Sequence, residues 1–186
     1  ATGTYHKQHL VPFGEYVPFE KWLRGTIAFF DLPMSVFSTG PKNQPPITAK
    51  NAVIATAICY EIAYPELVRA SAVNANLLLT LSNDTWFGKS IGPKQHFQIA
   101  RMRAIENGKP LIRATNDGIS ALVTADGAVS ATIPPYQRDI LEGTLEPRNG
   151  LTPFGTYGAY PVLILSGLIL FVALCRVSLR TTASTE

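Results

Sequence analysis

Residues 52–61, with the sequence AVIATAICYE, constrain the fold of this chain more than any other stretch. Seven mostly apolar residues lead directly into Cys59, and the β-branched residues among them favour a strand. The run does not alternate between apolar and polar residues, which is typical of a strand covered on both faces. A buried strand that ends on a thiol is a common way to present a nucleophile in an α/β protein. The alternative is a small buried cysteine that only fills the core.

A run without charge near the C-terminus is the second constraint. No charged residue occurs from position 149 to position 175, and the second half of this stretch is almost entirely apolar. As a helix, residues 157–175 would span about 28 Å, close to the hydrocarbon thickness of a bilayer. We therefore predict a transmembrane helix over residues 157–176. The alternative is a helix buried in a protein core.

The residues that flank this run predict how the chain is divided and oriented. Arg176 and Arg180 follow the run, and by the positive-inside tendency they place residues 177–186 in the cytoplasm. Residues 1–148 are then expected to form the folded part on the outer face of the membrane. A short linker over residues 149–156 joins the two parts and keeps the folded part close to the bilayer.

Composition limits the classes of function. The 16 basic and 13 acidic residues give a formal charge of +3, and because the basic residues are scattered we expect no nucleic-acid partner. Cys59 and Cys175 provide neither a disulfide framework nor the spacing of a zinc site, and His6 and His9 would point to opposite faces of a strand. We expect no metal or other cofactor. The chain begins at Ala1 with what reads as the middle of a domain, so we expect a fragment of a longer protein.

The order of the elements predicts a layered α/β domain in which strands and helices alternate and hairpins follow. An irregular loop is expected over residues 32–46, and tight turns at residues 116–118 and 126–127. The expected strands are residues 4–11, 52–58, 77–81, 110–114, 119–124, 128–133 and 140–145. The expected helices before the C-terminal run are residues 19–24, 64–73 and 93–107.

Reactive groups stand at several predicted strand ends and loops. A cysteine attacks a carbonyl as the thiolate, and a nearby ammonium such as that of Lys7 favours this form over the thiol. The same ammonium can stabilise the oxyanion of a tetrahedral intermediate. Cys59 and Lys7 are therefore candidate catalytic residues, with Glu15 or Glu61 as an accompanying carboxylate. His96 is not close to Cys59 in the sequence but is able to approach it in space.

Three motifs stand out in the sequence: residues 5–18 (YHKQHLVPFGEYVP), residues 58–61 (ICYE) and residues 82–88 (SNDTWFG). Together they resemble those of the apolipoprotein N-acyltransferase family, within the nitrilase-type carbon–nitrogen hydrolase superfamily. The resemblance continues through residues 92–93, 95–97 and 150–153 into the apolar tail, so it covers nearly the whole chain. The chain resembles the C-terminal part of these enzymes.

This resemblance implies a layered α/β/β/α nitrilase-like domain followed by one C-terminal transmembrane helix. It also implies a Glu-Lys-Cys triad, in which Cys59 is the nucleophile and Lys7 the cationic partner of the oxyanion. The general-base Glu of the triad precedes the Lys by a long stretch in the family and lies outside this chain. Glu15, Tyr60 and Glu61 match residues that support the site. We therefore expect the fragment alone to be inactive.

The resemblance further implies a ping-pong acyl transfer at the bacterial inner membrane. Cys59 takes an acyl chain from a membrane phospholipid as a thioester. The amine of a diacylglyceryl-cysteine at the N-terminus of a lipoprotein then attacks this thioester. We expect Asn83, Trp86 and Phe87, at the end of the second apolar strand, to bind the substrate, and we expect the protein to be a monomer.

Two other functions fit the same residues. In a membrane-tethered nitrilase-type amidase or hydrolase, the same Cys59 and Lys7 act, but water rather than an amine resolves the thioester. A module that binds lipoproteins without catalysis is the third reading, and the presence of both residues argues against it. The apolar loop over residues 27–37 and the predicted membrane helix favour lipid substrates.

Overall fold

The computed structural model describes residues 2–16, 18 and 37–183, with side chains described as far as Arg176. The helix predicted over residues 19–24 and most of the apolar loop therefore lie outside the described residues.

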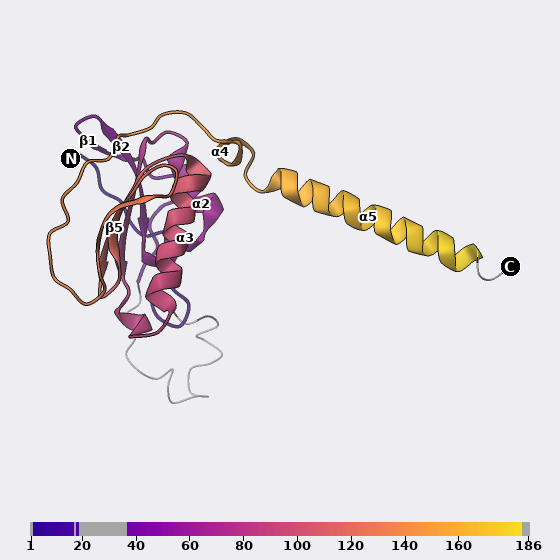
Figure 1. Ribbon diagram of the computed structural model, residues 1–186, viewed down its shortest axis with the longest axis horizontal. Coiled ribbons are helices and arrows are strands. Elements are labelled where there is room, and N and C mark those ends of the chain that lie inside the picture. The colour runs from indigo at the N-terminus through magenta and orange to yellow at the C-terminus, as the bar shows by residue number, and fades with distance from the viewer. Residues whose placement is uncertain (1, 17, 19–36, 184–186) are drawn as a thin grey trace.

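A six-stranded mixed sheet forms the centre of the described chain (Figure 1). The strands lie side by side in the order of the sequence. The pairs β2–β3 and β3–β4 are parallel, and the pairs β1–β2, β4–β5 and β5–β6 are antiparallel. The strands are β1 (Ile47–Ala49), β2 (Ala52–Ile58), β3 (Leu77–Asn83), β4 (Leu111–Asn116), β5 (Ser120–Val123) and β6 (Val129–Ile133).

Two helices, α2 (Pro65–Ala72) and α3 (Gly92–Asn107), cover one face of this sheet (Figure 1). Helix α2 begins with Pro65 at its first position, where the missing N–H costs nothing. Helix α3 ends at Gly108, whose φ of 61° forms a left-handed cap. Two short 3-10 segments, η2 (Cys59–Ala63) and η3 (Thr85–Phe87), follow the parallel strands β2 and β3.

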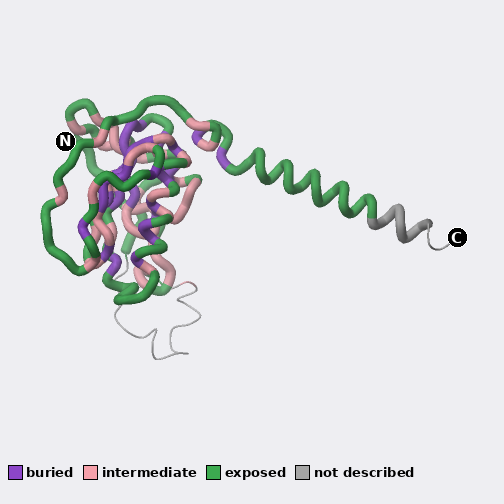
Figure 2. Tube along the Cα trace, viewed as in Figure 1, coloured by how far each residue is buried: buried purple, intermediate pink, exposed green. Residues whose placement is uncertain are grey.

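The hydrophobic core lies between the sheet and these helices, where the buried segments gather in Figure 2. Ala100 and Ala104 of α3 are fully buried, as are Leu111, Ala121 and Val123 of the sheet. The small side chains on α3 let the helix approach the strands closely, so the core excludes water without large residues on both sides.

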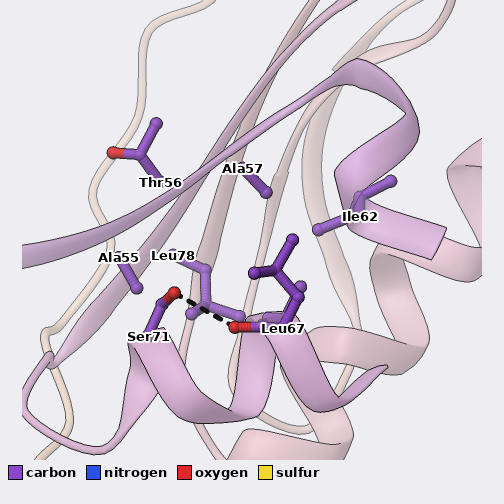
Figure 3. A pocket seen from close by; sticks show the side chains of 8 residues that line it. Ala55, Thr56, Ala57, Ile62, Leu67, Ser71 and Leu78 are labelled. Atoms are coloured by element: carbon purple, nitrogen blue, oxygen red, sulfur yellow. Dashed lines mark hydrogen bonds between the residues drawn. The ribbon is translucent and has the colours of Figure 1, made fainter. Parts of the chain in front are cut away.

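A small void remains in this core between β2, β3 and α2 (Figure 3). The hydroxyl of Ser71 donates to the carbonyl oxygen of Leu67 at 3.0 Å, and the side chain of Thr56 points away from α2. Most of the side chains that line the void are apolar, and we interpret it as a packing gap. It is lined by Ala55, Thr56, Ala57, Ile62, Leu67, Val68, Ser71 and Leu78.

The strand predicted over residues 4–11 is wrong. The described chain is irregular there, because its backbone N–H groups donate to side chains instead of to a neighbouring strand. The acceptors are the side chains of Gln44, Glu61 and Glu15. Side-chain acceptors of this kind compete with ladder formation for the same N–H groups.

The last predicted strand, over residues 140–145, is wrong as well. This segment has no regular structure, and Ile140 is 83% exposed. The N–H of Ile140 donates to the carboxylate of Asp139 at 2.8 Å, a local bond that replaces a ladder bond. Gly143 lies against the side chain of Leu122, so the segment contacts the sheet by packing alone.

The other elements confirm a mixed α/β fold. The strand before Cys59 has the predicted bounds, and β4 and β5 form the predicted hairpin, with Asp117 at φ 54° in its turn. Within the described residues there is one sheet with helices on one of its faces. These are two of the four layers expected for an α/β/β/α domain.

After β6 the chain runs irregularly to α4 (Pro153–Tyr157) and then to α5 (Tyr160–Ala183). The buried ammonium group of Lys109 bonds this connecting segment to the domain. Lys109 is 1% exposed, and its Nζ donates to the carbonyl oxygens of Arg148 at 3.5 Å and Gly150 at 3.1 Å. Burial lowers the pKa of Lys109, and the two carbonyls replace water around its charge.

Helix α5 extends away from the rest of the domain (Figure 1). Every side chain described along it, from residue 160 to residue 176, is exposed (Figure 2). None of the helices within the described residues combines the length and the apolar composition that a membrane span requires.

Two valines test where the core lies. Val123 is fully buried and Val73 is 42% exposed, so the same truncation to alanine should affect them differently. Val123→Ala should lower the free energy of unfolding by about 2–3 kcal/mol, since two buried methyl groups are lost and a cavity is left. Val73→Ala should change it by less than about 0.5 kcal/mol. Thermal unfolding of the full-length protein measures both, and equal effects would contradict the described core.

Candidate active site

Cys59 is the first residue after the parallel strand β2. Its φ is +53°, in the left-handed region that costs an ordinary residue free energy. This turn ends the strand abruptly and begins η2, so the thiol stands at the carboxyl end of the parallel strands. Cys59 is partly exposed and is not one of the buried core residues.

Glu61 lies two residues further on and is fully buried. Its carboxylate accepts four hydrogen bonds of 2.5 to 3.1 Å. One comes from the N–H of Ile58, at the end of β2, and the other three from the N-terminal segment. Those three donors are the phenol of Tyr5 and the backbone N–H groups of Gln8 and His9. Burial, together with the charge of Glu61, raises the pKa of Tyr5. One carboxylate therefore joins two parts of the chain that are some 50 positions apart.

Lys7 lies in the segment that Glu61 holds, next to one of the bonded residues. Its Nζ donates to both oxygens of Glu15, at 2.6 and 2.7 Å. Glu15 also accepts the N–H of Val11 at 2.8 Å, which fixes the carboxylate. Both charged side chains are largely covered, at 12% and 23% exposure, so this pair is better shielded from water than a surface ion pair.

Tyr60 takes part in an aromatic group beside the same turn. Its ring meets that of Tyr64 edge-on, with centroids 5.1 Å apart, and Tyr64 lies 4.6 Å from the ring of His9. Hydrogen bonding to Tyr60 raises the pKa of Tyr64 to about 12. Through Tyr64, the residue after η2, these rings form a second contact with the N-terminal segment.

The three predicted substrate-binding residues lie at and after the end of β3, and their surroundings differ. Trp86 is 75% exposed, while Phe87 is 43% exposed and packs edge-on against the ring of His96 at 6.0 Å. The side-chain oxygen of Asn83 accepts the N–H of Thr85 at 3.2 Å, so it caps η3 locally. Of these three residues, Phe87 therefore contacts His96, and His96 in turn contacts Cys59.

Sequence reasoning missed a buried polar cluster beneath the Cys59 turn. Asp84 follows β3, His96 lies on α3 and Arg113 lies on β4, and all three are more than nine-tenths buried. Asp84 Oδ1 is 2.8 Å from His96 Nδ1, and Arg113 donates to Asp84 Oδ2 at 2.9 Å. An arginine within the otherwise apolar start of β4 was the signal in the sequence, since a buried charge needs a partner.

The charges in this cluster depend on one another. Burial by itself would raise the pKa of Asp84, but the hydrogen bond from His96 and the charge of Arg113 hold it below its usual range. Burial lowers the pKa of Arg113, and Asp84 opposes that effect. Gly118 leaves room for the carboxylate, because a Cβ there would overlap it.

His96 does approach Cys59, as the sequence allowed, but it meets the backbone. Its Nε2 lies 3.3 Å from the carbonyl oxygen of Cys59. Among the described residues, no three His, Cys, Asp or Glu side chains gather as a metal site would require. The arrangement therefore combines a thiol on a strained turn, a shielded ammonium and buried carboxylates, a set suited to nucleophilic attack on a carbonyl.

Comparison with known families agrees with this chemistry. The family described as carbon–nitrogen hydrolase matches residues 1–149. The chain belongs to the carbon–nitrogen hydrolase family.

Individual proteins that are similar to this chain identify a more specific group within the family. The chain is 53% identical over 178 residues to the apolipoprotein N-acyltransferase of Pseudomonas aeruginosa, covering 96% of this chain and 35% of that protein. It is 52% identical to the apolipoprotein N-acyltransferase of Azotobacter vinelandii, covering 94% and 34%. These relatives confirm the resemblance seen in the motifs. The chain spans about a third of their length.

Among solved structures, the crystal structure of the C. elegans NitFhit protein matches 70% of this chain and 31% of its own, with a TM-score of 0.51 and 23% identity. At this identity the likeness concerns the fold alone, and it agrees with the nitrilase-like sheet and helices.

Replacing Glu61 by glutamine tests its role as an anchor. Glu61→Gln places an amide N–H₂ where the phenol of Tyr5 and the N–H of Ile58 now meet an oxygen, which leaves the N–H of Ile58 without its acceptor. We expect the free energy of unfolding to fall by about 1–3 kcal/mol. We also expect faster proteolytic cleavage within residues 2–16. Thermal unfolding and limited proteolysis of the full-length protein measure the two effects.

Glu66→Gln is the matched control, because the Glu66 side chain is 51% exposed and pairs with Arg69 on the surface. It should change stability by less than about 1 kcal/mol and leave the cleavage rate unaltered. Equal behaviour of the two variants would mean that Glu61 does not hold the N-terminal segment.

Proposed function

We propose that the protein transfers an acyl chain from a membrane phospholipid, through a thioester on Cys59, to the N-terminal amine of a diacylglyceryl-cysteine lipoprotein. The observation that carries this proposal is the docking of the Lys7 segment onto the Cys59 turn by Glu61. The similarity to apolipoprotein N-acyltransferases supports the choice of reaction.

In the first half of the reaction, the sulfur of Cys59 attacks the ester carbonyl of the phospholipid. The C–O bond breaks, and the lysophospholipid alcohol leaves with the proton of the thiol. In the second half, the amine attacks the thioester, the C–S bond breaks, and an amine proton returns to the sulfur. A glutamate outside this chain serves as the base that moves these protons.

Lys7 stabilises the oxyanion in both halves. An ammonium has three N–H donors, and two of them are occupied by the oxygens of Glu15. The third is left for the substrate oxygen on which negative charge develops. Glu15 therefore positions the ammonium, and Glu61 positions the segment that carries it. Tyr60 supports this segment through Tyr64, whose ring contacts that of His9.

The aromatic residues after β3 supply apolar surface for the acyl chain. Trp86 is exposed and Phe87 half-exposed, beyond the end of the strand next to β2. Asn83 lies at the same strand end and orients this segment through its cap on η3. An aromatic surface beside a thiol suits a lipid donor better than a small polar amide.

The missing layers and the membrane anchor belong to the same proposal. Leu81 is 45% exposed on β3, and in the full-length protein a second sheet would cover it and complete the α/β/β/α arrangement. The predicted membrane helix over residues 157–176 enters the lipid, since every side chain described from residue 160 to residue 176 is exposed and apolar ones predominate. The catalytic part then faces the outer side of the bacterial inner membrane, as a monomer.

Lys7→Arg tests the role of the ammonium. A planar guanidinium can still pair with Glu15 but does not place a compact ammonium at the oxyanion, so the transfer rate should fall by about 100- to 1000-fold. Lys94→Arg, on the exposed side of α3, should keep the wild-type rate. Acyl transfer by the full-length protein in detergent measures both. Near-normal activity of Lys7→Arg would make Lys7 an ordinary ion-pair residue.

The order of the two half-reactions separates a transferase from the alternative amidase or hydrolase. Given phospholipid alone, the full-length protein should gain the mass of one acyl chain on Cys59, and this adduct should persist, because neutral water attacks thioesters slowly. A diacylglyceryl-cysteine peptide should then discharge it and become N-acylated. Intact-protein mass spectrometry measures both steps.

Two cysteine variants are the controls for this experiment. Cys59→Ala should gain no mass, whereas Cys175→Ala, on the exposed helix α5, should behave as the wild type. If the adduct decayed to free fatty acid equally fast with and without the peptide, the enzyme would be a hydrolase.

A further inference from the structure

The turn that carries Cys59 needs support, because a non-glycine residue at φ +53° is strained. Such conformations cost on the order of 1–3 kcal/mol and persist only where surrounding contacts determine them. Two bonds within η2 contribute on one side of the turn. Glu61 accepts the N–H of Ile58 at 2.7 Å, and the N–H of Tyr64 donates to the carbonyl of Glu61 at 3.0 Å.

The contact on the other side of the turn is that of His96 Nε2 with the carbonyl oxygen of Cys59, at 3.3 Å. The carbonyl belongs to the strained residue itself, so its direction fixes ψ of Cys59 and the path of the chain into η2. Phe87 packs edge-on against the ring of His96 and shields it. A buried ring in this position acts on the nucleophile through the backbone and leaves the thiol free.

The position of the protons follows from the partners of the ring. An ionised carboxylate only accepts, so at 2.8 Å from Asp84 Oδ1 the Nδ1 of His96 carries hydrogen. Arg113 therefore donates to the second oxygen of Asp84 and not to the ring, although its NH2 lies 3.2 Å from Nδ1. The ring donates to the carbonyl of Cys59 as well when Nε2 also carries hydrogen. Asp84 then lies between two cations and neutralises part of their charge.

We propose that His96 is a positioning residue for the nucleophile. Held by Asp84, it donates Nε2–H to the carbonyl oxygen of Cys59 and so fixes the left-handed turn that aims the thiol at its substrate. This role rests on the proposed function of Cys59 as the nucleophile. Arg113 anchors the arrangement from below through Asp84 and through the carbonyl oxygen of Ile119, to which its Nε donates at 3.2 Å.

Two amide substitutions separate the two contacts of the ring. In His96→Gln the amide nitrogen reaches about as far as Nε2, so it keeps a donor for the Cys59 carbonyl and loses the bond to Asp84. In His96→Asn the amide nitrogen lies near the place of Nδ1, so it keeps the bond to Asp84 and loses the one to Cys59. Both variants remove the ring and its charge, which makes each the control for the other.

The experiment measures the reactivity of Cys59 without any lipid. The full-length protein, carrying Cys175→Ala so that one thiol of this chain remains, is treated with iodoacetamide, and alkylation of Cys59 is followed by mass spectrometry. The rate of acyl-adduct formation from phospholipid and the midpoint of thermal unfolding are measured in parallel. Gln95→Asn, an exposed shortening one position earlier on α3, is the control for changes to this helix.

We expect His96→Asn to slow adduct formation by about 100-fold, an effect that a 1 Å misplacement of a reacting group can have, and to slow alkylation of Cys59 as well. We expect His96→Gln to stay within about tenfold of the wild type, a difference of about 1.4 kcal/mol. Gln95→Asn should match the wild type. Because alkylation needs no lipid, slow alkylation confined to His96→Asn would support this role even if phospholipid formed no adduct and the proposed function failed.

Two results would overturn the inference. If His96→Asn were alkylated at the wild-type rate, the turn would not depend on the ring. If His96→Gln were as slow as His96→Asn at the same unfolding midpoint, the bond to Asp84 or the charge would matter, and not the donor to Cys59.

Discussion

The four hydrogen bonds accepted by the buried carboxylate of Glu61 are the interaction on which the candidate site depends. Residues 4–11 do not join the sheet, so no backbone ladder holds them beside Cys59. The N–H groups of Gln8, His9 and Val11 are satisfied by Glu61 and Glu15, and hydrogen bonds to a charged acceptor are stronger than neutral ones. Because this segment follows an irregular path, its backbone N–H groups are free to bind side chains. These bonds bring the segment that carries Lys7 to the end of β2.

The Cys59 turn is held by two contacts that differ in character. On one side of the turn, Glu61 accepts the N–H of Ile58. On the other side, His96 of the buried cluster contacts the carbonyl of Cys59. The two contacts hold the peptide group before Ile58 and the peptide group after Cys59, which lie on either side of the strained residue. The left-handed conformation of Cys59, which the local sequence disfavours, is therefore maintained by buried charged groups. Burying these charges costs free energy, and each of them has its partner only in the folded domain.

The sequence predicted those elements that local pattern determines. The strand before Cys59, helix α3 with its glycine cap, and the β4–β5 hairpin agree with the structure, because apolar runs and turn residues specify them. The segment over residues 4–11 was misjudged as a strand, since its partners are side chains that lie up to 53 positions away. No local pattern contains that information. The approach of His96 to Cys59 was open from the sequence, but its contact with the carbonyl follows from Asp84, which sequence reasoning overlooked.

The connection to α5 limits how this site can face its surroundings. Lys109 holds the carbonyls before α4, and Arg69 donates to the carbonyl of Gly155 at 3.2 Å, so the connection is bonded to the domain up to that helix. Gly158 follows with φ 58° and packs so closely on Glu66 that a Cβ would overlap its carboxylate. Free rotation between domain and helix is therefore confined to the few residues around this glycine. With α5 in lipid as proposed, the height of the catalytic edge above the membrane would be set by these polar contacts more than by the length of the linker.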